Sequence, residues 1–163
     1  MQTEELLAEE NVTTVAIKKI LVPSDFSAAS GNAFRYALRF AQDLGANLLL
    51  VHVLEPIPAP GYAALAEGSP LCEGDFAAAG RNLGEWVDSA SEVGVKAKLA
   101  LRVGLPAHEI VEIARDHDVD LIVIATHGHT GWKHFCIGST AERVVRAAPC
   151  PVLVVREKEH EFV

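Results

Sequence analysis

One segment of the chain, residues 120–156, combines glycines and hydroxyl side chains in an order that suits anion binding. An apolar run from Leu121 to Ala125 resembles a buried strand, and Ser139 begins an expected helix. A strand that leads through a glycine-rich loop to a helix N-terminus brings unpaired backbone N–H groups and the helix dipole to one place. We expect phosphate as the ligand. The glycines and hydroxyl residues concerned are Thr126, Gly128, Thr130, Gly131, Gly138, Ser139 and Thr140.

The same residues have a simpler interpretation. Ser139 and Glu142 match the capping box S-x-x-E, in which the serine hydroxyl accepts a hydrogen bond from the first turn of a helix, and this box needs no ligand. The surrounding glycines and hydroxyls favour phosphate. The helix dipole contributes only about 0.3 to 1 kcal/mol, whereas a hydrogen bond to a charged group contributes roughly 1.5 to 3 kcal/mol. We therefore expect several N–H groups of the loop to hold the anion.

A second group of polar residues, Pro23, Ser24 and Asp25, follows the first apolar run of the chain. A carboxylate at the end of a strand can accept hydrogen bonds from ribose hydroxyls or from an amino group. Asp25 could instead be an N-cap or turn residue before the helix expected at Ser27. Its place at a strand end favours binding.

The histidines do not form a recognisable metal site. His127, His129 and His134 lie close to Cys136, but their spacing matches no standard set of zinc ligands. We expect no dedicated metal site and expect His127 and His129 to donate to phosphate. His52 and His108 are expected to be structural.

Established catalytic motifs are absent from the sequence. The chain has neither G-x-x-x-x-G-K-[ST] nor G-x-G-x-x-G, which excludes P-loop kinases and classical NAD enzymes. No Ser/His/Asp or Cys/His arrangement can be recognised, so we expect any hydrolytic activity to be slow.

Composition restricts the class of protein further. The chain of 163 residues is 50% hydrophobic and 22% charged, which fits one globular domain. Its net charge of −8 and the lack of a basic cluster argue against nucleic acid as a partner. No apolar run is long enough to cross a membrane. Three scattered cysteines, Cys72, Cys136 and Cys150, suggest free thiols, so we expect a cytoplasmic protein.

Strand-like and helix-like patterns alternate along the chain. Strands that are almost continuously apolar and alternate with helices predict an α/β fold, a doubly wound parallel sheet with helices on both faces. In such a sheet the ligand lies at the carboxyl ends of the strands, where the strand order reverses. The expected strands are 17–23, 47–53, 95–103, 120–125 and 152–155, with 95–103 near an edge, and the expected helices are 27–44, 72–93, 106–117 and 139–147.

From about Ile17 to Arg156 the chain resembles the universal stress protein family. The resemblance rests on Lys19 to Ser27, Leu50 to Val53, Gly104 to Pro106 and the stretch from Thr126 to Val155. It implies a five-stranded, three-layer, Rossmann-like sheet of the adenine nucleotide alpha-hydrolase-like type, usually in a dimer. Some members of the family bind ATP through G-x-x-G, nine residues, then G-[ST]. This chain keeps the spacing with Gly128, Gly138 and Ser139, but Ala125 replaces the first glycine.

The resemblance also implies a set of site residues. Asp25 would hold the adenosine, Val53 would offer backbone groups to the base, and Pro23 and Ser24 would form the floor. The methyl group of Ala125 either crowds the ribose or α-phosphate or is accommodated. The phosphate-binding residues implied, together with those considered above, are His127, Gly128, His129, Gly138, Ser139 and Thr140.

The leading hypothesis is a nucleotide-binding stress-response protein that acts as a regulatory dimer. Its ligand would be ATP or another adenine nucleotide, with Mg²⁺ as an accompanying ion. Two alternatives stay open: a dimeric interaction module of the same family without nucleotide, and a weak ATP hydrolase. We expect the homodimer to form through the apolar strand Val152 to Val155, since an uncovered sheet edge would aggregate.

The remaining segments lie outside the predicted domain, 17–156, or interrupt it. Residues 1–16 and 157–163 are expected to be tails, the first of them acidic. Residues 55–71 are rich in proline and glycine and form either a lid over the strand ends or a loose insertion.

Overall fold

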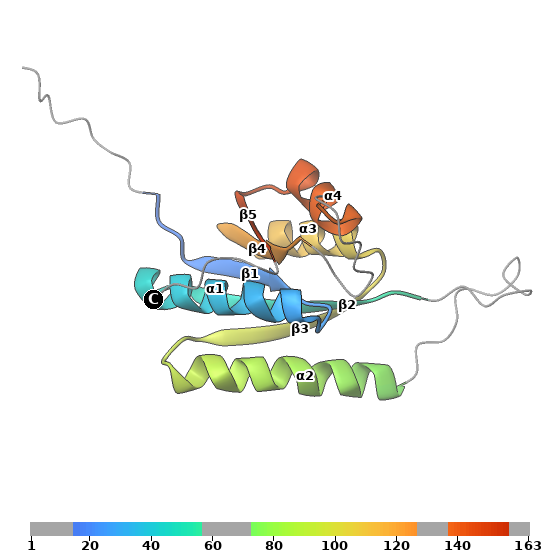
Figure 1. Cartoon of the computed structure of the whole chain (residues 1–163), viewed down its shortest axis with the longest axis horizontal. Helices are drawn as coiled ribbons and strands as arrows, with labels where there is room; N and C mark the ends of the chain where they lie inside the picture. Colours follow the sequence, from blue (N-terminus) through green and yellow to red (C-terminus); the bar gives the residue numbers. More distant parts are fainter. Residues whose placement is uncertain (1–14, 57–72, 127–136, 157–163) are drawn as a thin grey trace, which may run out of the picture.

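A computed structural model describes residues 15–56, 73–126 and 137–156, and within them strands and helices alternate (Figure 1). The predicted boundaries agree with the observed ones to within two residues. The elements in chain order are β1 (Lys19–Pro23), α1 (Ala28–Leu44), β2 (Asn47–Leu54), α2 (Glu73–Glu92), β3 (Ala97–Val103), α3 (Pro106–Asp116), β4 (Leu121–Ala125), α4 (Ser139–Ala147) and β5 (Val152–Val155).

The five strands form one parallel sheet in the order β3-β2-β1-β4-β5. The chain builds outward from β1 to β3, then returns to the other side of β1 and continues to β5. The predicted fold class, a doubly wound parallel sheet covered on both faces, is therefore confirmed. The strand order reverses between β1 and β4, so a crevice is expected at their carboxyl ends. β3 and β5 are the edge strands, which confirms the edge position predicted for β3.

The core consists of two apolar layers because successive side chains of each strand point to opposite faces of the sheet. Ile20 and Val22 of β1 contribute to the layer under α1 and α2, whereas Leu21 contributes to the layer under α3 and α4. Figure 1 shows the two pairs of helices on opposite sides of the sheet. Because helices cover both faces of the sheet, side chains on both faces of a strand are buried. The strand sequences are therefore continuous apolar runs.

Local signals in the sequence define the ends of the helices. The Ser27 hydroxyl accepts a hydrogen bond of 3.2 Å from the Ser30 N–H and caps α1, and Gly45 ends that helix with a positive φ of 67°. Pro106 occupies the first turn of α3, where its missing N–H costs nothing. None of the helices in the described ranges is long and apolar enough to cross a membrane.

Cys150 is a free thiol that follows α4. Burial raises the pKa of this thiol above its ordinary value, and the Asp120 carboxylate raises it further. At neutral pH the Cys150 side chain is therefore a protonated, apolar group that packs with the layer under α3 and α4. Cys72 and Cys136 lie outside the described residues.

We predict that Leu83→Ala lowers the free energy of unfolding by about 2 to 5 kcal/mol, because Leu83 in α2 is 0% exposed and its removal leaves a cavity. The matched control is Leu44→Ala, the same change in α1 at a side chain that is 50% exposed, and its cost should stay below about 1 kcal/mol. Urea unfolding followed by circular dichroism measures both. Equal losses in the two variants would contradict the assignment of the core.

Candidate functional site

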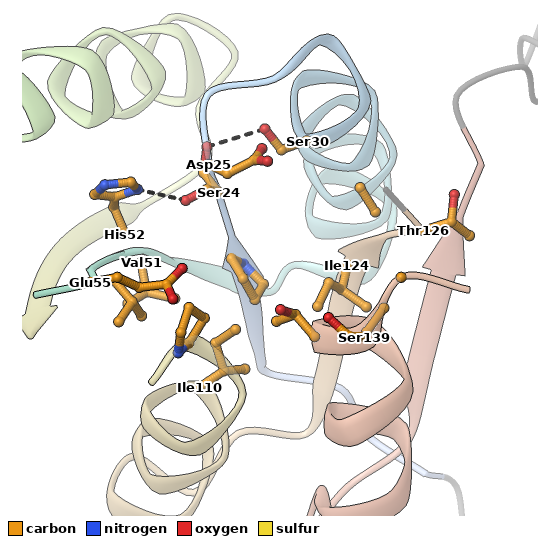
Figure 2. A pocket seen from close by; sticks show the side chains of 17 residues that line it. Ser24, Asp25, Ser30, Val51, His52, Glu55, Ile110, Ile124, Thr126 and Ser139 are labelled. Atoms are coloured by element: carbon orange, nitrogen blue, oxygen red, sulfur yellow. Dashed lines mark hydrogen bonds between the residues drawn. The ribbon is translucent and has the colours of Figure 1, made fainter. Parts of the chain in front are cut away.

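A pocket of about 400 Å³ opens at the carboxyl ends of β1, β2 and β4 (Figure 2). It lies at the reversal of strand order, where a ligand is expected in this class of sheet. The N-terminal turns of α3 and α4 complete it. Its lining residues are Pro23, Ser24, Asp25, Ser30, Val51, His52, Val53, Glu55, Pro106, Ile110, Ile124, Ala125, Thr126, Gly138, Ser139, Thr140 and Ala141.

The floor of the pocket is the turn between β1 and α1. The Ser24 N–H donates to the Val51 carbonyl at 2.8 Å, which continues the pairing of β1 with β2. The Ser24 side chain is only 8% exposed, and its hydroxyl lies 3.3 Å from the hydroxyl of Ser30. The same hydroxyl accepts from the Phe26 N–H at 3.0 Å. These bonds fix the direction in which the chain leaves the sheet.

Asp25 has the turn role that its sequence position allowed, and it also lines the pocket. Its carboxylate accepts a hydrogen bond of 3.0 Å from the Ser27 N–H, as in a turn before a helix. The residue is also half-buried in the wall of the pocket. The turn bond therefore orients the carboxylate and leaves it beside the space where a ligand would lie.

Phe26 holds an unusual backbone conformation next to Asp25. Its φ of 64° lies in the left-handed region, which costs a bulky residue about 1 to 2 kcal/mol. The side chain compensates through aromatic contacts: its ring centroid lies 4.5 Å from that of His52 and 6.5 Å from that of Trp86 in α2. Trp86 in turn stacks on Phe34 of α1 at 4.6 Å. The strained turn is thus supported by packing against two helices.

His52 ties β2 to this turn. Its Nδ1 lies 2.8 Å from the carbonyl oxygen of Ser24, and because a carbonyl only accepts, Nδ1 is the donor (Figure 2). The structural role predicted for His52 is confirmed, although its ring also borders the pocket.

Val53 presents its backbone to the pocket because β2 is longer than β1. Residues of β2 point their N–H and C=O groups alternately to the two neighbouring strands. The Asn47 N–H and the Val51 carbonyl bond toward β1, whereas the Leu54 carbonyl accepts from Gly104 on the β3 side. Val53 therefore points toward β1, but the paired register ends at Pro23 and Val51. Within the described ranges, the Val53 N–H and C=O therefore have no strand partner on this side, at the edge of the pocket.

The N-terminus of α4 forms the opposite wall. The Gly138 N–H donates to the Thr126 carbonyl at 2.7 Å, so this amide is already paired within the protein. The N–H groups of Ser139, Thr140 and Ala141 belong to the first turn and have no acceptor one turn earlier in the helix. The anion-binding capacity of the described wall therefore lies in these amides. Gly138 has φ −59° and ψ 152°, which any residue can adopt, so its backbone conformation does not require glycine.

The predicted capping box is wrong. Gly138 is the N-cap, Ser139 is already the first residue of α4, and no side chain caps this helix. The Glu142 carboxylate pairs with Arg146 one turn later at 2.8 Å. Because the box does not form, the Ser139 hydroxyl is not committed to capping.

Ala125, the departure from the glycine motif, ends β4 at the pocket. Alternation along the strand directs Ile124 to the layer under α3 and α4 and Ala125 to the layer under α1 and α2, where it packs against the core. Its methyl group therefore points away from the α4 wall. The predicted residues His127, Gly128 and His129 lie outside the described residues.

The pocket contains residues that the sequence reasoning missed. Glu55 directly follows β2, so extending the rule that ligands bind beyond strand ends would have found it. Thr126, which follows β4, was already among the hydroxyl residues expected at the anion site. Ser30, Pro106, Ile110 and Ile124 are brought in by packing and carry no comparable signal. In the described ranges no group of three or more His, Cys, Asp or Glu side chains could hold a metal ion.

Comparison with known proteins assigns a family to this arrangement. Residues 16–156 match the model described as the universal stress protein family. Universal stress protein MJ0531 of Methanocaldococcus jannaschii is 36% identical over 144 residues, which cover 88% of this chain and 85% of that protein.

Solved structures show the same fold. That of MJ0577, also from Methanocaldococcus jannaschii, has a TM-score of 0.73 and 28% identity and covers 90% of this chain and 100% of that one. UspA from Lactobacillus plantarum has a TM-score of 0.75 and 29% identity, with coverage of 88% and 100%. A universal stress protein from Archaeoglobus fulgidus, solved in complex with dAMP, has a TM-score of 0.64 and 23% identity, with coverage of 87% and 99%.

We predict that His52→Phe lowers the free energy of unfolding by about 0.5 to 1.5 kcal/mol, because the ring contact with Phe26 is kept while the donor to the Ser24 carbonyl is lost. His108→Phe, the same change at an exposed position of α3, is the control and should be near neutral. Urea unfolding measures both, and a His52 variant as stable as the control would show that the bond does not support the turn.

Proposed function

The chain belongs to the universal stress protein family, and we propose that it binds an adenine nucleotide in the pocket between Val53 and the N-terminus of α4. One observation carries the proposal: a backbone donor–acceptor pair and a set of helix N-terminal amides face the same pocket from opposite walls. The pocket volume of about 400 Å³ lies in the range of small-molecule sites, roughly 300 to 1,000 Å³.

The Val53 backbone is complementary to adenine. The base offers an acceptor, N1, beside a donor, the N6 amino group, and these match an N–H and a C=O that point the same way. Apolar side chains of Val51 and Ile110 border the same part of the pocket and would cover the faces of the ring. Guanine presents a donor and an acceptor in the reverse order, so the same edge disfavours it.

The ribose and phosphates would occupy the rest of the pocket. The Asp25 carboxylate, oriented by its bond to Ser27, would accept hydrogen bonds from ribose hydroxyls. The amides of Ser139, Thr140 and Ala141 would donate to the phosphate nearest the ribose. We propose ATP as the longest ligand of this kind, with Mg²⁺ bridging its phosphates. The fold of the Archaeoglobus fulgidus protein accepts dAMP, and likeness at 23% identity extends to the fold alone.

Binding, rather than rapid chemistry, is the function that we propose. Ligand occupancy would shift the conformation or partner surface of a regulatory dimer in the cytoplasm. The two other hypotheses predict different results in solution. A pure interaction module gives no heat with any adenine nucleotide, and a hydrolase releases phosphate steadily.

The amide of Ser139 can be tested without breaking the helix. We predict that Ser139→Pro weakens the binding of AMP and ATP about tenfold or more, because it removes one donor to a charged group. Proline is tolerated at the first position of a helix, and the extended conformation of Gly138 is compatible with a following proline. Isothermal titration calorimetry measures the affinities.

Ser139→Ala is the matched control, because it removes the hydroxyl but keeps the N–H. Its affinity should exceed that of Ser139→Pro by several fold. If the two variants bind equally, the amide does not hold the phosphate. If the unmodified chain gives no heat with AMP or ATP, the proposed function itself is wrong.

We further propose that β5 forms the homodimer. Odd residues of β5 bond to β4, since the Pro151 and Val155 carbonyls accept from Ile122 and Thr126. The N–H groups of Val152 and Val154 therefore point to the open edge. This edge is available to the same strand of a second copy.

We predict that Val154→Pro converts the dimer to a monomer, because proline removes an outward N–H and keeps the bonds to β4. The control is Val103→Pro on the other edge strand, β3, which should leave the dimer intact. Size-exclusion chromatography with light scattering gives the mass. A dimer that survives Val154→Pro would exclude pairing along this edge.

A further inference from the structure

The charges of the pocket are distributed unevenly. Asp25 and Glu55 are the carboxylates among the described lining residues, and none of these residues is Lys or Arg. Figure 2 shows both carboxylates on the side of β1 and β2, across the pocket from Ser139 of α4. The wall proposed to hold the base and ribose is therefore acidic, whereas the wall proposed to hold phosphate offers neutral amides and the positive end of a helix.

Glu55 contributes a full charge to the acidic wall. The residue directly follows β2, two positions after Val53, and is exposed. In the part of the chain that the structure describes, its carboxylate takes part in no salt bridge, whereas Asp43, Glu112, Asp116 and Glu142 each pair with an arginine. No described cation therefore pairs with the Glu55 carboxylate.

The ribose position follows from the two ends of the ligand. With the base on Val53 and the 5′-phosphate on the α4 amides, the sugar lies between them, and its 2′ and 3′ hydroxyls are near the acidic wall. A hydroxyl donates to a carboxylate and is favoured there. A phosphate at either position carries negative charge and has no proton to donate to a carboxylate, so it is repelled there.

We propose that Glu55 is a specificity-determining residue that excludes adenine nucleotides carrying an additional phosphate monoester on the 2′ or 3′ hydroxyl of the ribose. This inference rests on the proposed adenine nucleotide site and adds the class of ligand that the site rejects. The pocket takes adenine nucleotides phosphorylated on the 5′ oxygen, and it discriminates against those that carry an additional phosphate monoester on the ribose.

The test compares ligands that differ by one phosphoryl group. Calorimetric titrations of the full chain use AMP, adenosine 3′,5′-bisphosphate and adenosine 2′,5′-bisphosphate, all in EDTA so that no divalent ion bridges phosphate and carboxylate. ADP, which carries its second phosphate at the 5′ end, controls for the number of phosphoryl groups. We expect both bisphosphates to bind at least about tenfold more weakly than AMP, and ADP to bind within a few fold of AMP.

Glu55→Gln keeps the size of the side chain and removes its charge. We expect this variant to reduce several fold the ratio by which the chain binds AMP more tightly than the bisphosphates. The control is Glu85→Gln on the exposed surface of α2, which alters the net charge equally and should leave the ratio unchanged. Raising the salt concentration should reduce the discrimination in the unmodified chain, since exposed charges are screened.

The outcomes separate the two proposals. If AMP binds and the bisphosphates bind equally well, the selectivity is refuted and the adenine nucleotide site stands. An unchanged ratio in Glu55→Gln removes Glu55 from the explanation. If AMP itself gives no heat, the proposed function fails, and the selectivity fails with it.

Discussion

The site depends on a difference in strand length. β1 ends at Pro23, opposite Val51, while its neighbour β2 continues to Leu54 along β3. The extra residues of β2 keep their partners on one side only, so the backbone of Val53 is left facing a space instead of a strand. Because the chain turns sharply at Ser24 into α1, that space stays open. The pocket is therefore a consequence of where one central strand stops.

Keeping β1 short requires a turn that is unfavourable for its sequence. Phe26 adopts a left-handed conformation in which glycine would be less strained, and the cost is of the same order as a few hydrogen bonds. The His52 bond to the Ser24 carbonyl and the contacts of Phe26 with His52 and Trp86 offset it. The backbone of Phe26 is strained, but its ring packs against Trp86 of α2. Because Asp25 precedes Phe26 in this turn, the orientation of Asp25 depends on the packing of α2.

The sequence was sufficient for the elements and their order but not for all contacts of the site. Periodicity, Pro106 and Gly45 predicted the helices because these signals act locally. Asp25 and Ser139 were predicted because strand ends and helix starts can be read from the chain, whereas Val53 was implied by the family resemblance; all three line the pocket. The capping box prediction failed because Gly138, and not Ser139, is the N-cap of α4. The start of this helix is also tied to β4 by the bond from the Gly138 N–H to the Thr126 carbonyl, which the sequence does not reveal. Ile110 and Ser30 enter the pocket only through tertiary packing.

The described walls would hold an anion without a cationic side chain in a chain of net charge −8. Long-range attraction therefore cannot supply the affinity, because the overall field repels a nucleotide. The helix dipole is too weak to do so, and the larger contribution must come from hydrogen bonds donated by amides at fixed positions. Such bonds act only on a phosphate placed within reach, so position rather than charge decides what binds. The acidic wall strengthens that requirement, since an anion displaced toward β2 meets carboxylates instead of amides.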